Sequence, residues 1–241
     1  MNQFLQSTAA LVVIFSLTIS VWAQVPQSSG KADRQRVCHT MGNLDRLINA
    51  HPKMEQRMAS IEKQTNAFVK RMKRNPQERS QLVVTIPVVF HVLYNTATEN
   101  ISEAQVLSQL QIMNDDFRRL NADQDNVWSQ AADTQIEFCL ATQDPQGNPS
   151  DGILRVPTSV TQFGTNDNMK FSSQGGSDAW PASEYLNFWV CDLGSSLLGY
   201  AQFPGGPANT DGVVCTYTAT GDVGTAQFPF DLGRTGTHEI G

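Results

Sequence analysis

After residue 20 the sequence lacks any apolar run long enough to cross a membrane as a helix, which argues against a helical membrane protein. It also lacks an internal repeat, which excludes solenoid and propeller architectures. What remains is a chain of 241 residues, 40% of them hydrophobic and 8% aromatic. This is enough for one sizeable core plus an accessory segment, so we expect a globular chain that is soluble once mature.

The first 30 residues contain no lysine or arginine, yet they resemble a secretory leader. Residues 9–20 (AALVVIFSLTIS) form an apolar run that is short for a membrane span. Val21-Trp22-Ala23 then offers a small-x-small cleavage site before Gln24. We predict a signal peptide at 1–23, a secreted, extracellular product and no membrane partner after its removal. An uncleaved anchor or a buried strand remains the alternative, because the leader carries no basic residue.

Charge divides the remaining chain into two parts. Residues 31–80 contain 12 Lys and Arg against 5 Asp and Glu, whereas residues 81–241 contain 5 against 18. The corresponding net charges of +7 and −13 give the total of −6. A basic arm can bind nucleic acid, but a signal peptide argues against that partner. Electrostatic attraction between the two parts is the simpler interpretation.

The basic segment, 24–80, has helical periodicity. One narrow apolar stripe repeats at spacings of three and four: Met54, Met58, Ile61, Thr65, Phe68 and Met72. Pro52 precedes the stripe, and Asn75-Pro76 ends it. We predict a helix that needs a partner surface for its stripe, or else a free amphipathic helix on a membrane or another protein.

From residue 81 onward the pattern predicts a mixed α+β domain. The stretch 82–93 (LVVTIPVVFHVL) is typical of a buried strand, and a helix is predicted from Ser102 to about Asn121. Further strands are predicted at 135–141, 152–156, 185–191, 198–203 and 212–217, and a last helix from Thr235. The segments between them are rich in Gly, Asn, Asp, Ser and Pro, as loops are.

The four cysteines are placed unevenly. Cys139, Cys191 and Cys215 lie in the strand-rich part, while Cys38 stands alone in the basic segment. A secreted chain with four cysteines favours disulfide bonds, and Cys38 could pair with a cysteine of the body or with one outside the chain. Alternatively, the Cys38 thiolate could occupy the open position of a catalytic zinc and keep an enzyme latent.

The last seven residues, TGTHEIG, begin like the zinc-protease helix H-E-x-x-H. In that motif two histidines four residues apart share a helix face and bind one metal, and the glutamate reaches the attacking water as general base. Only His238 and Glu239 of the motif are present. The pair alone is weak evidence for a zinc site, because a His-Glu pair can also lie on a solvated helix.

The longer sequence strengthens the motif through a resemblance. The stretches TIPVVFHVLY, SDGILRV, YLNFWVCDLGSSLLGYAQFPGG, TDGVV and LGRTGTHEIG occur in order between about Val83 and Gly241. They resemble the pappalysin family of metzincin metallopeptidases. Arg36 to Met41 is similar to the cysteine-switch region of bacterial members, in which Cys-Gly-Thr is usual and His39 replaces the glycine.

The resemblance implies a zincin-like upper catalytic subdomain with a twisted mixed sheet, preceded by a helical prosegment. It makes His238 the first zinc ligand, Glu239 the general base and Cys38 the ligand of the latent form. The remaining zinc ligands, the Met-turn and the lower subdomain have no positions in this chain, which we therefore expect to be a truncated and inactive fragment. Calcium is possible, but no residue can be assigned to it.

Two further segments have interpretable roles. The resemblance makes Leu198, Gly199, Tyr200 and Ala201 the edge strand that binds an extended peptide or protein substrate, and a sheet edge has the backbone groups for this. An ordinary core strand is the alternative. His91 is interpreted as structural, because it is isolated within a predicted strand.

We therefore predict a secreted zinc endopeptidase zymogen. The alternatives are a non-catalytic secreted remnant, or a β-rich binding module in which the His238-Glu239 pair is incidental.

Overall fold

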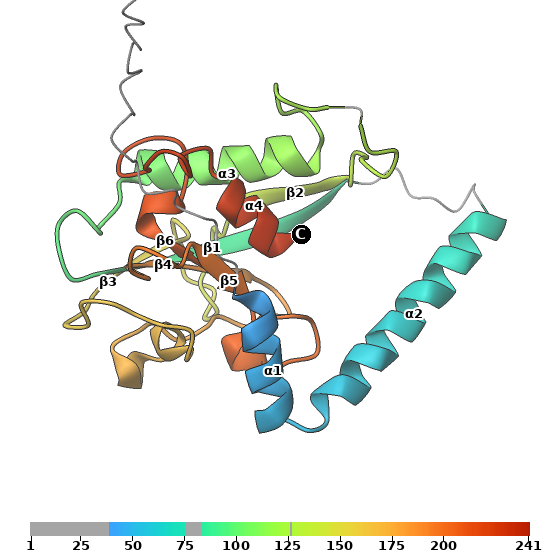
Figure 1. Cartoon of the computed structure of the whole chain (residues 1–241), viewed down its shortest axis with the longest axis horizontal. Helices are drawn as coiled ribbons and strands as arrows, with labels where there is room; N and C mark the ends of the chain where they lie inside the picture. The colour runs from blue at the N-terminus through green and yellow to red at the C-terminus, as the bar shows by residue number, and fades with distance from the viewer. Residues whose placement is uncertain (1–38, 76–82, 126) are drawn as a thin grey trace, which may run out of the picture. The chain divides into compact units, whose positions relative to one another are not determined.

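The computed structural model describes residues 39–75, 83–125 and 127–241. The predicted signal peptide and Cys38 lie outside these residues. Within them, no helix is both long enough and apolar enough to cross a membrane. The elements are shown in Figure 1.

The domain is built on one six-stranded sheet in the order β2-β1-β4-β6-β5, with β3 also paired to β1. The strands are β1 (Val84–Tyr94), β2 (Ile136–Leu140), β3 (Ile153–Pro157), β4 (Leu186–Cys191), β5 (Gly199–Ala201) and β6 (Val213–Thr216). β2 and β3 pair with successive halves of β1. All pairings are parallel except β5 with β6, so the sheet is mixed and its last strand is antiparallel.

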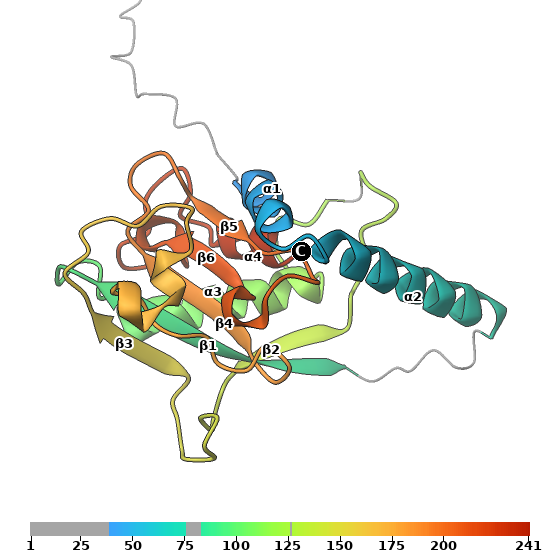
Figure 2. The ribbon, with the colours of Figure 1, turned by 90° about the horizontal axis from the view of Figure 1, so that it is seen from below.

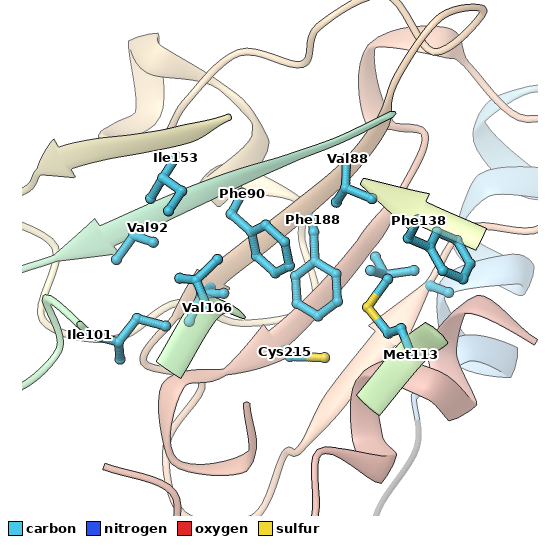
Figure 3. Close-up of a cluster of buried hydrophobic side chains, with 13 residues drawn as sticks. Val88, Phe90, Val92, Ile101, Val106, Met113, Phe138, Ile153, Phe188 and Cys215 are labelled. Atoms are coloured by element: carbon cyan, nitrogen blue, oxygen red, sulfur yellow. The ribbon is translucent and has the colours of Figure 1, made fainter. Parts of the chain in front are cut away.

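One face of the sheet is covered by α3 (Glu103–Phe117) and α4 (Arg234–Ile240), as Figure 1 shows. Alternate residues of β1 point to this face, because successive side chains of a strand lie on opposite sides. They pack with side chains from β4, β6 and α3, as in Figure 3: Val88, Phe90, Val92, Val106, Met113, Phe188 and Cys215. Ser102 caps α3 by accepting a hydrogen bond from the Gln105 N–H at 3.2 Å.

The other face is covered by irregular segments and short 3₁₀ turns. The turns on this face are Asn168–Lys170, Ser172–Gln174 and Ala208–Thr210. A fourth turn, Tyr217–Ala219, lies instead on the face of α3, where the Gln105 amide donates to the Tyr217 carbonyl at 3.0 Å. Trp189, Tyr200 and Val214 of the sheet form a second buried cluster with side chains that include Met169 and Leu197. β1 and β4 are therefore buried on both faces, which explains their nearly continuous apolar sequences.

The basic segment contains two helices, α1 (Thr40–Ala50) and α2 (Met54–Arg74). The stripe predicted the second helix, and the first was missed. Met54 at the start of the stripe is fully buried, whereas Ile61 and Phe68 are 39% and 55% exposed. Among the described residues, the stripe is thus covered mainly at its beginning.

The predicted fold class is confirmed: the chain is α+β with a mixed sheet, and each predicted strand of residues 81–241 is present in the predicted order. The predicted disulfide framework is not formed in the described part of the chain. Cys139 is exposed, while Cys191 and Cys215 are buried on β4 and β6. Burial raises the pKa of the Cys191 thiol far above its ordinary value, so this thiol stays protonated.

Candidate active site

Helix α4 carries the His-Glu pair and packs tightly on α3. A Cβ added to Gly236 would lie 2.6 Å from the Gln109 amide nitrogen, so a larger residue here would displace the buried Gln109 side chain. Gln109 is buried and donates to the Gly233 carbonyl at 3.0 Å. Gly233 itself has a φ of 64°, a left-handed conformation that favours glycine at the turn before the helix. The two glycines of the sequence L-G-R-T-G therefore have different roles: Gly233 allows the turn before α4, and Gly236 allows α4 to pack closely on α3.

Asp116 at the end of α3 fixes the orientation of α4. It pairs with the Arg234 guanidinium and accepts a hydrogen bond from the Thr237 hydroxyl at 2.6 Å. Arg234 also contacts Asp123 at 2.6 Å. The Asp116 carboxylate therefore holds α4 at two places, at Arg234 in its first turn and at Thr237 in its middle.

His238 and Glu239 point in different directions from α4. His238 is exposed and borders an open hollow that Asp116, Asp123 and Arg234 also line. Glu239 is only 7% exposed. Its Cγ lies 3.2 Å from the position of a Cβ built on Gly199, so it packs against β5.

The edge of the sheet beside Glu239 is β5, and α1 lies against it (Figure 2). The Ala201 N–H donates to the Thr40 hydroxyl at 3.0 Å, and the Ala201 carbonyl accepts from the Asn43 side-chain amide at 3.0 Å. Backbone groups of Leu198 and Gln202 bond in the other direction, to the Thr216 N–H and the Gly212 carbonyl. Ala201 therefore presents the outward-facing backbone groups of this edge.

Thr40 connects this edge with the helix. Its hydroxyl accepts from Ala201 and donates to the Glu239 carboxylate at 2.9 Å. A hydroxyl has one donor and two acceptor sites, so both bonds are compatible with one Thr40 rotamer. One residue of α1 thus joins the predicted substrate strand to the predicted general base.

The predicted substrate-binding residues have unequal roles. Leu198 precedes β5 and is buried, and the Tyr200 side chain is fully buried in the second cluster. Gly199 packs against Glu239. A Cβ at this position would lie 2.7 Å from the Val214 carbonyl oxygen, so a side chain would collide with it. Of the four, Ala201 is the residue whose backbone α1 occupies.

A buried ionic cluster lies behind β5. Asp167 accepts from the Tyr200 hydroxyl at 3.0 Å and pairs with the Lys170 ammonium at 2.9 Å. Lys170 is fully buried, donates to the Thr210 carbonyl at 2.7 Å and lies over the Trp189 and Tyr200 rings. Burial lowers the pKa of Lys170 and Asp167 counteracts this, while burial raises the pKa of Tyr200.

This cluster also receives a side chain from α1. Arg46 pairs with the second oxygen of Asp167 and donates to the Asn43 amide oxygen at 2.6 Å. The Asp167 side chain is 2% exposed and that of Arg46 is 39% exposed. Sequence reasoning missed these residues; one available signal was that Lys170 is the only lysine after residue 80.

His91 lies apart from α4, on the opposite face of the sheet. Its Nδ1 is 2.8 Å from the Ser177 hydroxyl and its Nε2 is 3.1 Å from the Asn187 amide oxygen. Its ring stacks on Trp189, with 4.9 Å between centroids. Burial lowers the pKa of His91 to about 4, so the ring is neutral near pH 7. These contacts agree with the predicted structural role.

The described residues do not form a complete metal site. They contain no group of three His, Cys, Asp or Glu side chains able to hold an ion. His238 is a suitable zinc donor, but a catalytic zinc takes three protein ligands. The described residues therefore offer one side chain that zinc accepts, His238, but not the three protein ligands that a catalytic zinc takes.

Proteins similar to this chain are found among solved structures. Neither a family model nor a curated protein matches the chain. Among solved structures, it is similar to a promirolysin mutant from Tannerella forsythia, with 44% identity, a TM-score of 0.71 and coverage of 85% of this chain and 67% of that one. A mature mirolysin from Tannerella forsythia in complex with a cleaved peptide is 51% identical, with a TM-score of 0.64 and coverage of 67% and 63%.

A mirolysin in complex with a ligand described as compound 9 is also 51% identical, with a TM-score of 0.63 and coverage of 66% and 62%. The chain thus spans somewhat less than two thirds of these two mirolysin chains. The promirolysin match extends over more of this chain than the match to mature mirolysin does.

Proposed function

Because this chain belongs to the metzincin-type metallopeptidases that include mirolysin, we propose that it is part of a zinc-dependent endopeptidase made in a latent form. We assign residues 1–23 to a signal peptide, 24–80 to an inhibitory prosegment and 81–241 to the upper part of the catalytic domain. We also propose that the protein belongs to the pappalysin family, that it is secreted, and that further residues of the whole enzyme complete its zinc site.

The bridge made by Thr40 carries the proposal. It joins Ala201 on the edge of the sheet to Glu239 on α4, at 3.0 and 2.9 Å. A peptide that binds along β5 would need the backbone groups of Ala201, and the glutamate would need to face its scissile bond. A contact from the proposed prosegment to both groups would block substrate binding and the general base together, which supports a latent form.

Each residue then has a distinct task. His238 would be one zinc ligand, and bound zinc supplies a water of lowered pKa. Glu239 accepts a proton from the attacking water and passes it to the leaving amine. Ala201 aligns the peptide by adding it to the sheet as an antiparallel strand.

Latency follows from competition for the same groups. While α1 is docked, Thr40 and Asn43 occupy both backbone groups of Ala201. Thr40 also engages the Glu239 carboxylate. Cys38, two residues before Thr40, is proposed to bind the metal in this state, because a thiolate can fill the open position of a catalytic zinc.

The test uses the full-length enzyme with the prosegment removed. We expect Glu239→Gln to retain zinc but to lower peptide hydrolysis by about 10² to 10⁴, the usual contribution of a general base. His238→Ala should lose zinc and activity together. Zinc content and hydrolysis are measured side by side, and near-normal hydrolysis by Glu239→Gln would exclude the proposed mechanism.

A further inference from the structure

Two glutamines of α3 are buried although their amides are polar. Gln105 and Gln109 are both 0% exposed. They are one helical turn apart in sequence, so they share a face of α3. Burying an amide costs free energy unless its donors and acceptors are hydrogen-bonded. The hydrogen-bond partners of the two side chains therefore indicate the role of this face.

Gln105 binds the backbone of the segment that connects β6 to α4, residues 217–233. Its amide nitrogen donates to the carbonyls of Tyr217 and Thr220, at 3.0 Å each. Its amide oxygen accepts from the Thr225 N–H at 2.9 Å. The connecting segment thus obtains from α3 the hydrogen bonds that a strand or helix would obtain from its own ladder.

Gln109 extends this contact to the helix that carries the His-Glu pair. Its amide oxygen accepts from the Gly221 N–H at 2.8 Å, and its amide nitrogen donates to the Gly233 carbonyl at 3.0 Å. The same nitrogen would lie 2.6 Å from a Cβ on Gly236. Gln109 therefore contacts α4 both at the turn before the helix and two residues before His238.

We propose that Gln109 is a positioning residue for the His-Glu pair. It fixes α4 relative to α3, and through α4 it sets how tightly His238 binds zinc and where Glu239 lies relative to the substrate. Gln105 supports it by holding the connecting segment. This assignment rests on the proposed peptidase function and adds to it a residue that touches neither metal nor substrate.

Hydrogen bonds give the contact between α3 and α4 a direction that apolar packing lacks. Apolar burial is non-directional, so it draws two helices together without fixing how they lie. The bonds of the Gln109 amide, in contrast, weaken steeply when their angles change. Asp116, about two helical turns later on α3, holds Arg234 and Thr237. Directed contacts from two points of α3 therefore hold α4, which lies with α3 on one face of the sheet (Figure 1).

The experiment uses the full-length enzyme after removal of its prosegment. Gln109→Met keeps the length of the side chain but removes both hydrogen bonds. Zinc affinity, measured by competition with a chromophoric chelator, should fall about tenfold, as it does for residues that orient metal ligands. A displacement of about 1 Å at the general base should lower kcat about 100-fold. KM should stay close to the wild-type value, because the peptide-binding backbone groups of Ala201 belong to β5.

Asn114→Leu is the matched control on the same helix. The Asn114 amide also binds two backbone groups, the Phe138 N–H at 2.7 Å and the Phe138 carbonyl at 3.0 Å, but these belong to β2. Both variants replace an amide by an apolar side chain of similar size, so both should lower the stability of the zinc-free enzyme in denaturant titrations. Only Gln109→Met should lower zinc affinity and kcat.

Wild-type zinc affinity and kcat in Gln109→Met would overturn the proposal. Equal losses in Gln109→Met and Asn114→Leu would also overturn it, because the effect would then be a general loss of stability. Failure of the wild-type enzyme to bind zinc or to cleave any peptide would instead reject the proposed function.

If Gln109→Met does not fold, Gly236→Ala decides. This variant keeps every hydrogen-bonding atom of Gln109 but places a methyl group 2.6 Å from its amide nitrogen, so that Gln109 or α4 must move. It should weaken zinc binding about tenfold. Gly164→Ala, where a Cβ meets no atom within 4 Å, should not. Wild-type zinc affinity in Gly236→Ala would contradict the positioning role.

Discussion

Histidine has different chemistry at two positions in this chain because the two sites differ in burial and partners. His91 is fully buried and both ring nitrogens contact polar side chains, so it has no nitrogen left for a metal. His238 is exposed on α4. The sequence context already distinguished the two, since His91 lies inside an apolar strand and His238 precedes a glutamate in a helical motif.

The partners of His91 could not be predicted in the same way. Ser177 and Asn187 are 86 and 96 residues away in sequence, and only the fold brings them to the ring. The same holds for Asp167 and Lys170. These residues are only three positions apart in sequence, but their burial depends on side chains of β4 and β5 that lie far from them in sequence. Local patterns indicate which side chains are unusual, whereas tertiary packing determines what they contact.

Burial of His91 predicts a pH-dependent stability. Its pKa is about 4 in the folded protein and about 6.5 when the chain unfolds, so the unfolded state binds more protons between these values. Stability should therefore fall as the pH is lowered from about 6.5 to about 4, by about 3 kcal/mol in total. Chemical denaturation at a series of pH values measures this loss.

The matched comparison is His91→Gln, which retains polar atoms but cannot titrate in this range. This variant should be less stable at pH 7 and should have a flatter pH profile, whereas His51→Gln, at an exposed position, should follow the wild type. If His91→Gln keeps the full wild-type slope between pH 6.5 and pH 4, other groups cause the acid sensitivity.

At the level of elements, the strands were predictable and α1 was not. Each strand has an apolar or β-branched run between loop-forming residues, which is a local signal. α1 has no side-chain cap and no acidic residue in its first turn, and its sequence contains Gly42 and two asparagines. Its buried residues, Asn43 and Leu47, show that contacts with the domain help to hold it.

The position of β5 at the edge is likewise a property of the whole sheet. Its sequence predicts a strand, but the order β2-β1-β4-β6-β5 follows from long-range pairing. The family resemblance suggested an edge role for 198–201. The structure adds that Ala201 is the residue engaged there by Thr40 and Asn43.

The contacts of Thr40 predict how firmly α1 holds the latent state. Thr40→Val keeps the shape of the side chain but removes the acceptor for Ala201 and the donor to Glu239. At about 1 kcal/mol for each of the two hydrogen bonds, α1 should dock about 30-fold more weakly. The full-length zymogen should then show higher basal peptide hydrolysis and a shorter latent period.

Asn49→Ala provides the control, because Asn49 is exposed on the same helix. It should leave the latent period unchanged. Equal latency of Thr40→Val and the wild type would mean that this bridge does not contribute to inhibition, even if Cys38 does.

At the level of the whole molecule, the sequence predicted attraction between the basic segment and the acidic domain. Direct contacts account for part of this attraction: Arg46 pairs with Asp167, and Arg57 donates to the Gly205 carbonyl at 2.5 Å. Many other basic residues of α2, including Lys63, Lys70 and Arg74, are exposed. Their contribution would be long-range, because they face water.

Long-range attraction and direct pairing respond differently to salt. The Debye length falls from about 10 Å at 0.1 M to about 3 Å at 1 M, which screens exposed charges but affects partly buried pairs much less. Raising sodium chloride over this range should therefore shorten the latent period of the full-length zymogen. Basal hydrolysis before activation is measured at each concentration, with the mature enzyme as the control for direct salt effects on catalysis. Arg46→Gln should start from a shorter latent period and retain most of the salt dependence, since the +7 and −13 charges of the two segments remain nearly unchanged. A latent period that does not change with salt in the wild type would show that short-range contacts of α1 alone hold the prosegment in place.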